Sequence, residues 1–353
     1  MNTRSGLLGR ARSLVVSGLG IFTVLSLCST ISARSGNLDF EFSLRSAYDD
    51  NILSYSDADL DLMDDPAAPE NKYGIISRDD YIFVPTIGLT YKTHMAKHTT
   101  YFGLAAAYNY YMDNDIKRHG RLGAMARRYF RRGMYLQADL TLIPDYYYRN
   151  SYSTTAGYQE AKFDKISGRA KFSFQPFKKV IANISYEYSN KNFESLFDER
   201  DIKAHRFKVE GIYKPGKRWK GWGSYAFETA GAAGADNPTF LRDTSYDSFI
   251  FTYGSRFYLR GLGRKALQLA GVVSYSITYF QSGKLTDEDR YRFGRKDDLW
   301  QISLTIEQQI NKHLDFGLGF KRRSKAVDLP AVDLAPFLEY TSNLAYFNLI
   351  FAY

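Results

Sequence analysis

Hydrophobic and polar positions alternate along nearly all of the chain after residue 38. Between positions 182 and 186, for example, Ala182, Ile184 and Tyr186 alternate with Asn183 and Ser185. Successive side chains of a β-strand point to opposite faces of the sheet, so this period of two predicts strands with one apolar and one polar face. We find no segment that sustains the period of an amphipathic helix.

Fourteen segments carry this pattern, and most hold ten to fifteen residues. Strands of soluble proteins average about five or six residues, whereas a tilted strand needs roughly 9–11 residues to cross a bilayer. The lengths therefore favour membrane-crossing strands over a soluble β-sandwich. The expected strands are 39–48, 81–92, 99–112, 121–130, 134–147, 161–175, 180–190, 201–213, 219–229, 246–259, 266–280, 297–308, 313–322 and 338–353.

The connections between these segments alternate in length. Those after the even-numbered segments are short, as at 214–218 and 261–265, and those after the odd-numbered segments are long and polar, as at 49–80 and 281–296. Short turns at one end and long loops at the other are typical of up-and-down membrane barrels. Backbone groups in hydrocarbon must all be paired, so a sheet there has to close on itself.

The sequence therefore predicts an all-β fold, a single antiparallel up-and-down transmembrane β-barrel of about 14 strands, with 12 to 16 as the range. Aromatic residues make up 16% of the chain. Their clusters are predicted to form the girdles that flank the lipid-facing band. The clusters are Tyr108, Tyr110 and Tyr111; Tyr146, Tyr147 and Tyr148; and Phe249, Phe251 and Tyr253.

The amino-acid composition excludes several other classes of protein. A single cysteine excludes a disulfide framework and a thiolate zinc site. The mean hydropathy of −0.37 excludes a helical membrane bundle. No cofactor is predicted, because there is no glycine-rich phosphate loop between a strand and a helix.

The first 33 residues have the order of a secretory signal peptide. Arg4, Arg10 and Arg12 precede the apolar stretch 13–28, and small residues follow up to Ala33. Residues 1–33 are therefore predicted to be a cleaved signal peptide, and residues 34–353 an outer-membrane β-barrel. A single anchoring helix and a lipoprotein site at Cys28 are the alternatives; Leu27 stands where the lipoprotein site needs a small residue.

The C-terminal segment carries a second targeting pattern. Aromatic and aliphatic residues alternate on one face and end in an aromatic; they are Phe347, Leu349, Phe351 and Tyr353. This resembles the last-strand signal of outer-membrane barrels, and the resemblance implies recognition by the barrel assembly machinery.

The run Tyr48-Asp49-Asp50-Asn51-Ile52 resembles the opening motif of a family of β-barrel porins from Gram-negative bacteria. The resemblance covers these five residues and the overall layout, and it implies an outer-membrane location.

Basic residues outnumber acidic ones on the face predicted to point inward. Ten of them are candidate pore-lining residues: Arg45, Arg121, Arg127, Lys165, Arg169, Lys171, Arg206, Lys208, Arg256 and Lys321. Lys92 and Lys220 share that face, against seven acids: Glu41, Asp139, Glu187, Glu210, Glu228, Glu307 and Asp315. A bore lined by Lys and Arg favours anions, so we expect a channel for passive diffusion of small polar or anionic solutes. The alternative is a non-conducting barrel, its charges paired across the lumen, with a structural role or a role in export of a polymer or partner.

The loop 49–80 is acidic, and Asp57-x-Asp59-x-Asp61 has the spacing of calcium ligands. It lacks the glycine and distal glutamate of an EF-hand loop, so a solvated loop that meets lipopolysaccharide is preferred, and calcium binding between Asp57 and Asp65 stays open.

The run 127–132 is basic and aromatic. Export makes nucleic acid an improbable partner, and arginines that reach lipid headgroups are the preferred interpretation.

An enzyme is not expected. None of the five histidines is followed two residues later by serine, as in outer-membrane phospholipases. The expected partners are outer-membrane lipid and lipopolysaccharide, and the oligomeric state is left open.

Overall fold

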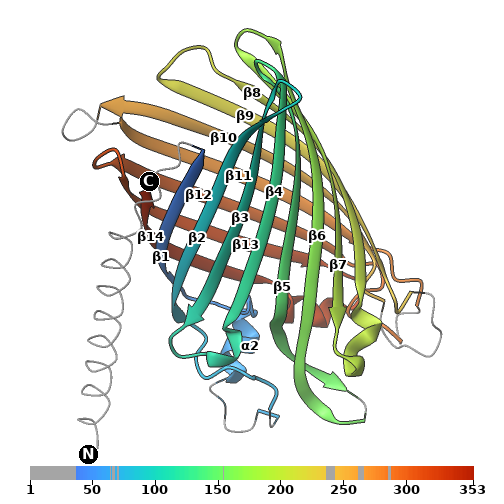
Figure 1. Cartoon of the computed structure of the whole chain (residues 1–353). Helices are drawn as coiled ribbons and strands as arrows, with labels where there is room; N and C mark the ends of the chain where they lie inside the picture. The colour runs from blue at the N-terminus through green and yellow to red at the C-terminus, as the bar shows by residue number, and fades with distance from the viewer. Residues whose placement is uncertain are drawn as a thin grey trace, which may run out of the picture. The chain divides into compact units, whose positions relative to one another are not determined.

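In the computed structural model, every strand pairs with its sequence neighbours and the sheet closes between β1 and β14. The structure describes residues 37–63, 65, 68–69, 71–153, 155–235, 243–260, 266–284 and 288–353. The predicted signal peptide lies outside these residues. Figure 1 shows the strands side by side around the barrel. This confirms the prediction of an antiparallel up-and-down barrel with fourteen strands.

The described elements follow in chain order. The strands are β1 (Leu38–Asp49), β2 (Asp80–Met95), β3 (His98–Tyr111), β4 (His119–Arg131), β5 (Met134–Ser153), β6 (Gly157–Phe177), β7 (Val180–Phe193), β8 (Ile202–Tyr213), β9 (Trp219–Ala232), β10 (Tyr246–Arg260), β11 (Ala266–Phe280), β12 (Lys296–Gln309), β13 (Leu314–Asp328) and β14 (Tyr340–Ala352). The helical segments are α2 (Asp57–Met63), η1 (Asp115–Lys117), η2 (Ser195–Arg200) and η4 (Val332–Phe337).

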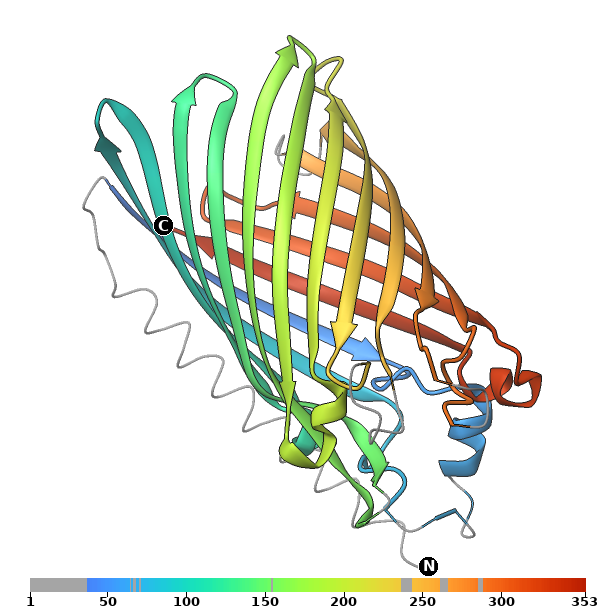
Figure 2. The same ribbon diagram turned by 90° about the vertical axis from the view of Figure 1, so that its right-hand side faces the viewer.

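Tight turns gather at one end of the barrel, which we call the turn end, and α2 and the longer connections lie at the opposite loop end (Figures 1 and 2). The backbone φ of both Ala96 and Lys97 is positive, at 48° and 67°. A two-residue hairpin with this backbone matches the twist of its strands. Gly133 has a φ of 75° in the next turn at this end, where a Cβ would also meet the side chain of Gln175.

The strands β5 and β6 are longer than the sequence pattern predicts, at 20 and 21 residues. Their hairpin continues past the expected loop, since β5 ends only at Ser153 and β6 begins at Gly157. A bulge interrupts β5 at Pro144 and Asp145, where the register against β6 shifts between Ile143 and Tyr146. Proline cannot donate a ladder hydrogen bond, so a bulge is where a strand tolerates it.

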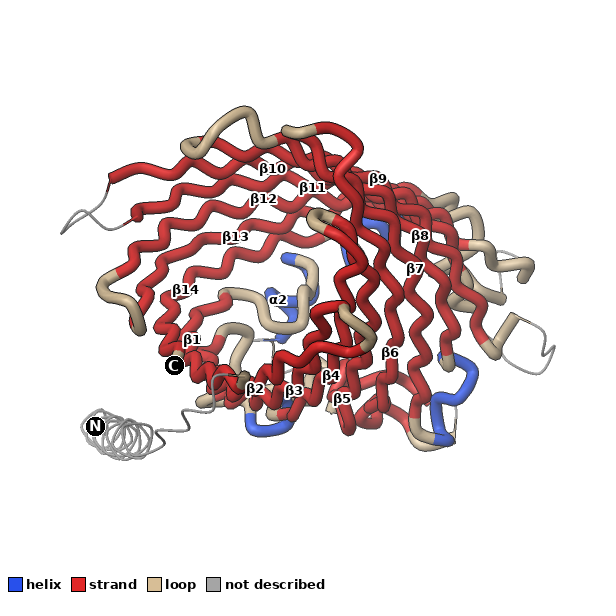
Figure 3. Tube along the Cα trace, turned by 45° about the horizontal axis from the view of Figure 1, so that its top comes forward, coloured by secondary structure: helices blue, strands red, loops and turns tan. Residues whose placement is uncertain are grey.

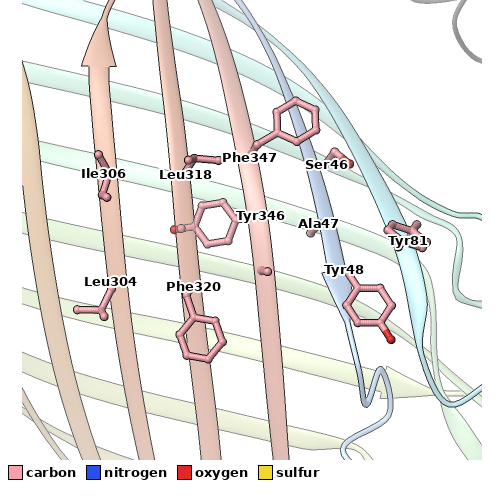
Figure 4. Close-up of a pocket in the computed structure, with 12 residues that line it drawn as sticks. Ser46, Ala47, Tyr48, Tyr81, Leu304, Ile306, Leu318, Phe320, Tyr346 and Phe347 are labelled. Atoms are coloured by element: carbon pink, nitrogen blue, oxygen red, sulfur yellow. The ribbon is translucent and has the colours of Figure 1, made fainter. Parts of the chain in front are cut away.

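Large apolar side chains cover one face of the sheet. Leu104, Phe207 and Leu304 are 64%, 57% and 56% exposed although they lie in the middle of strands. Such an exposed apolar band needs a hydrocarbon surrounding rather than water. Figure 4 shows part of this face over β12, β13, β14 and β1. There, apolar side chains such as Ile306, Leu318 and Phe347 line a shallow depression of about 550 Å³.

Candidate functional site: the lumen and its loop end

The opposite face of the sheet is polar and encloses the lumen. A cavity of about 600 Å³ is lined by side chains from β5 through β11, among them Lys165, Lys191 and Thr278. Residues from strands so far apart around a barrel can share one cavity only on its inside. Because paired residues share a face of the sheet, the register extends this assignment to every other strand.

The register places all ten basic candidates on this inner face. Lys165 is opposite Lys191, Arg169 is opposite Glu187 and Asp139, and Lys171 is opposite Ser185. The same rule carries the inner face to the remaining candidates, which are Arg45, Arg121, Arg127, Arg206, Lys208, Arg256 and Lys321.

Acidic side chains on the inner face pair mainly with bases close by in the sheet. Asp139 lies 2.9 Å from Arg169 on the adjacent strand, and Glu228 pairs with Arg206 in the same way. Glu210 lies 3.2 Å from Lys208. These pairs run along the wall and do not bridge the bore. The basic surplus on the wall is therefore not cancelled by them.

Some lumenal bases were missed because the expected strands were too short. Arg323 and Lys325 alternate with outward residues of β13 beyond the expected end at 322, and Lys191 lies one residue beyond the expected end of β7. Outward positions there are polar, Arg322 and Ser324, so the hydrophobic alternation fades although the strand continues. The repeat of basic residues at every second position was the available signal.

The predicted aromatic girdle at Tyr146–Tyr148 is wrong. Tyr146 and Tyr148 line the lumenal cavity, and Tyr147 is 1% exposed beneath the first loop. The bulge at Pro144 and Asp145 explains the error, because an extra residue turns the following side chains to the other face. Tyr108, Tyr110, Phe251 and Tyr253 are exposed, as girdle residues should be, whereas Tyr111 is buried and the prediction for it is wrong.

The described part of the first loop, which spans residues 50–79, lies at the loop end and packs against the inner wall. Leu53, Tyr55 and Ile75 are buried in one cluster with Tyr147 of β5, and Leu60 of α2 packs against it. Figure 3 shows α2 within the outline of the ring of strands. At Gly74 the backbone of the loop lies against Tyr147, because a Cβ at this position would collide with the Tyr147 hydroxyl.

The run Tyr48–Ile52 ties this loop to the seam between β1 and β14. The Asn51 side-chain amide donates to the carbonyls of Tyr55, at 2.7 Å, and Thr341, at 3.2 Å, and its oxygen accepts from the Tyr55 amide at 2.9 Å. Asp50 accepts from the backbone and side-chain amides of Asn343 at 2.7 and 2.8 Å. Asp49 accepts from Ser342 at 3.1 Å. These residues hold the start of the loop against the last strand.

The same run also fixes the end of the loop. The Tyr48 hydroxyl donates to Asp79 at 2.7 Å, and the Ile52 amide donates to the carbonyl of Arg78 at 3.0 Å. Hydroxyl donation from Ser77 and Tyr48 holds the pKa of Asp79 below its usual value. All five residues of the run thus contribute a hydrogen bond to one structure, which we call the loop clamp: Tyr48, Asp49, Asp50, Asn51, Ile52 and their partners.

A second network of hydrogen bonds joins the first loop to the start of β2 and to the residues that follow β3. The Asp80 carboxylate accepts from the backbone amides of Met112 and Asn114, each at 2.9 Å. The Asn114 side chain accepts from the amide of Ile76 at 2.8 Å and donates to Asp80 at 2.9 Å. Beside it, burial lowers the pKa of Lys117 to about 8, and its ammonium group donates to the carbonyl of Tyr147.

The described aspartates Asp57, Asp59 and Asp61 are not arranged as a set of metal ligands. Residues 57, 59 and 61 lie in α2, where positions two apart point to different sides of the helix. Asp59 instead accepts from Lys72 at 2.9 Å and from Tyr73 at 3.2 Å. Within the described residues, no cluster of three His, Cys, Asp or Glu side chains could hold a metal ion.

The last strand places its predicted signal residues on the outer face. Phe347, Leu349 and Phe351 lie opposite Ser46, Leu44 and Phe42 of β1. Tyr353 follows β14 and exchanges backbone hydrogen bonds with Phe40, at 2.9 and 3.1 Å. These contacts show a role in closing the sheet. Recognition by the assembly machinery stays a prediction.

A closed antiparallel sheet with an apolar exterior and a polar lumen defines a transmembrane β-barrel of the outer-membrane type. The barrel wall meets lipid through its exposed apolar band. Among the described residues, no helix has the length and apolar character needed to cross a membrane.

The comparisons with known proteins show which solved structures this chain is similar to. No family model and no curated protein matches the chain. Similar solved structures include a bacterial polysaccharide outer-membrane secretin, with 8% identity and a TM-score of 0.47, covering 88% of this chain and 98% of the other. The outer-membrane channel DcaP of Acinetobacter baumannii has 10% identity and a TM-score of 0.44, covering 90% and 98%. An anion-selective porin from Comamonas acidovorans has 9% identity and a TM-score of 0.42, covering 90% and 98%. The class of this chain follows from its own sheet and side chains, not from these likenesses.

Proposed function

We propose that this barrel is an outer-membrane channel for the passive diffusion of small polar or anionic solutes. The observation that carries the proposal is the surplus of basic side chains on the inner face, where the ion pairs follow the wall and leave cations such as Lys171 and Lys321 without an acidic partner in the described chain. Cations fixed in a low-dielectric wall attract anions and repel cations. About eight strands suffice for a filled interior, and this barrel has fourteen.

Planar-bilayer recordings test the channel. In a tenfold gradient of potassium chloride we expect stepwise conductance and a reversal potential with the sign of chloride preference. Lys321→Gln should shift the reversal potential toward zero. Arg322→Gln is the matched control, because it removes one positive charge from the outer face of the same strand. Absence of conductance, or a reversal potential of cation sign, contradicts the proposal.

A second candidate is a non-conducting barrel that supports the envelope or exports a polymer or partner. The first loop favours it, because the loop packs onto the inner wall at Tyr147 and is tied to the seam at Asn51. Recordings of the intact protein without current steps, and with steps after deletion of residues 57–72, would support this candidate.

Four further points belong to this proposal. The signal peptide 1–33 is cleaved, and the loop end contacts lipopolysaccharide. The assembly machinery binds the last strand through Phe347, Leu349, Phe351 and Tyr353, and the protein has no enzymatic activity.

A further inference from the structure

The lumenal cavity near the loop end brings together two kinds of side chain on the wall that β5, β6 and β7 form. The first kind is a row of aromatic rings that crosses three strands. Tyr146 of β5, Phe163 of β6 and Phe193 of β7 follow one another with ring centroids 5.0 Å apart at each step. Such a row presents continuous ring surface, on which another aromatic ring can pack edge to face or offset.

The second kind is a pair of cations two residues along the same strands from Phe163 and Phe193, with no acidic partner among the described residues. Lys165 and Lys191 lie directly opposite each other on β6 and β7, and both line the cavity. Neither ammonium group has a hydrogen bond or ion pair within the described chain, and the Lys191 ammonium lies 5.6 Å from the ring centroid of Phe163. Like charges in directly opposed positions of a sheet destabilise it. An anion between them would remove that repulsion.

The other charged groups of the cavity are already engaged. Arg295 holds Asp297 through two hydrogen bonds of 2.5 and 2.6 Å. Glu228 is bound by Arg206 and accepts from the Tyr246 hydroxyl at 2.6 Å. The Glu228 carboxylate therefore cannot neutralise the two lysines without giving up these partners.

We propose that this cavity binds a small aromatic carboxylate, with the carboxylate between Lys165 and Lys191 and the ring against the aromatic row. The proposal rests on the proposed channel function and names the solute class of that channel. Ile143 and Ile202 also line the cavity, so its wall suits an apolar ring better than a sugar acid rich in hydroxyl groups. The volume of about 600 Å³ is large enough to keep water around a single-ring solute.

Binding is measurable without conduction. Saturation-transfer NMR with the full chain in lipid nanodiscs, with empty nanodiscs as the blank, should show benzoate bound with magnetisation transfer to its ring protons. Cyclohexanecarboxylate, which keeps the charge, and benzyl alcohol, which keeps the ring, should each bind at least fivefold more weakly. Lys165→Gln with Lys191→Gln should weaken benzoate binding tenfold or more, and Phe163→Leu threefold or more.

The controls separate a specific site from general attraction. Lys178→Gln with Lys179→Gln removes the same charge from the turn between the same two strands and should leave binding unchanged. Lys165→Arg with Lys191→Arg should retain it, and heat-dependent gel mobility reports whether each variant is folded. Unchanged binding in the folded Lys→Gln pair, or glucuronate binding as tightly as benzoate, would overturn the proposal. Benzoate binding without conductance would defeat the channel function alone, and conductance without binding would defeat this site alone.

Discussion

The two sides of the loop end differ in whether their polar side chains have hydrogen-bonding partners. On the side of β1, β2 and β14, the buried side chains of Asn51, Asp80 and Asn114 find partners in the first loop and the rim. On the side of β6 and β7, Lys165 and Lys191 face a cavity without an acidic partner in the described chain. A satisfied polar network fixes one structure, whereas unpaired cations beside open space are a site for a ligand. We therefore infer that the first side holds the loop in place and that the second side contacts the solute.

The largest expected effect comes from breaking the satisfied side. Asn51→Ala removes three hydrogen bonds, two to buried backbone groups of Tyr55 and one to the half-buried Thr341. Each lost bond to a buried group costs roughly 1–3 kcal/mol, so we expect the loop clamp to open. Hydrogen exchange of amides 51–79, followed by mass spectrometry, should accelerate at least a hundredfold.

The exposed Asn192 offers the control for that experiment. Asn192→Ala should leave exchange in the first loop at the level of the unmodified protein. Equal exchange in the Asn51→Ala variant and the unmodified protein would mean that the clamp does not hold the loop.

A smaller effect is expected from adding free charge to the open side. Glu228→Gln releases Arg206 from its ion pair beside the cavity, and the neutral amide can still accept from Tyr246. The lumen then gains one uncompensated positive charge, and we expect benzoate affinity to rise about two- to threefold, a change of less than 1 kcal/mol. Weaker binding in the folded variant would show that Glu228 supports the site rather than limiting its charge.

The smallest effect is a pH dependence of the clamp. Hydroxyl donation from Ser77 and Tyr48 lowers the pKa of Asp79, so the carboxylate stabilises the closed loop above its unfolded pKa. That stabilisation is lost as the pH falls through the still lower pKa of the folded state. After correction for intrinsic rates, exchange at amides 76–79 should be faster at pH 3 than at pH 6. Asp79→Asn should exchange equally at both values; a persistent pH effect in that variant would assign it to another group.

Much of the barrel was predictable because its strands obey a strict physical rule. Where β12 crosses the bilayer, Trp300, Ile302 and Leu304 must face lipid, and the sequence shows that alternation directly. The rule weakens where a strand leaves the membrane. The first two outward residues of β13 after Phe320, Arg322 and Ser324, are polar, so the lumenal Arg323 and Lys325 were not recognised.

The loop end was less predictable because its contacts depend on distant partners. Nothing near Asn51 in the sequence indicates Thr341, although the two are 290 residues apart and hydrogen-bonded. The bulge at Pro144 could have been suspected from the proline. Its effect, which turns Tyr146 toward Phe163 and the lumen, depends on the register of β6.

The seam has a consequence for how the molecule is made. Phe40 and Tyr353 are joined by two backbone hydrogen bonds across 313 positions of the chain. Until β14 pairs with β1, one edge of β1 has unpaired backbone groups that can hydrogen-bond to another strand. Contacts so far apart in sequence form slowly, so these two edges favour aggregation until they meet, and the sheet becomes a closed cylinder only when they do.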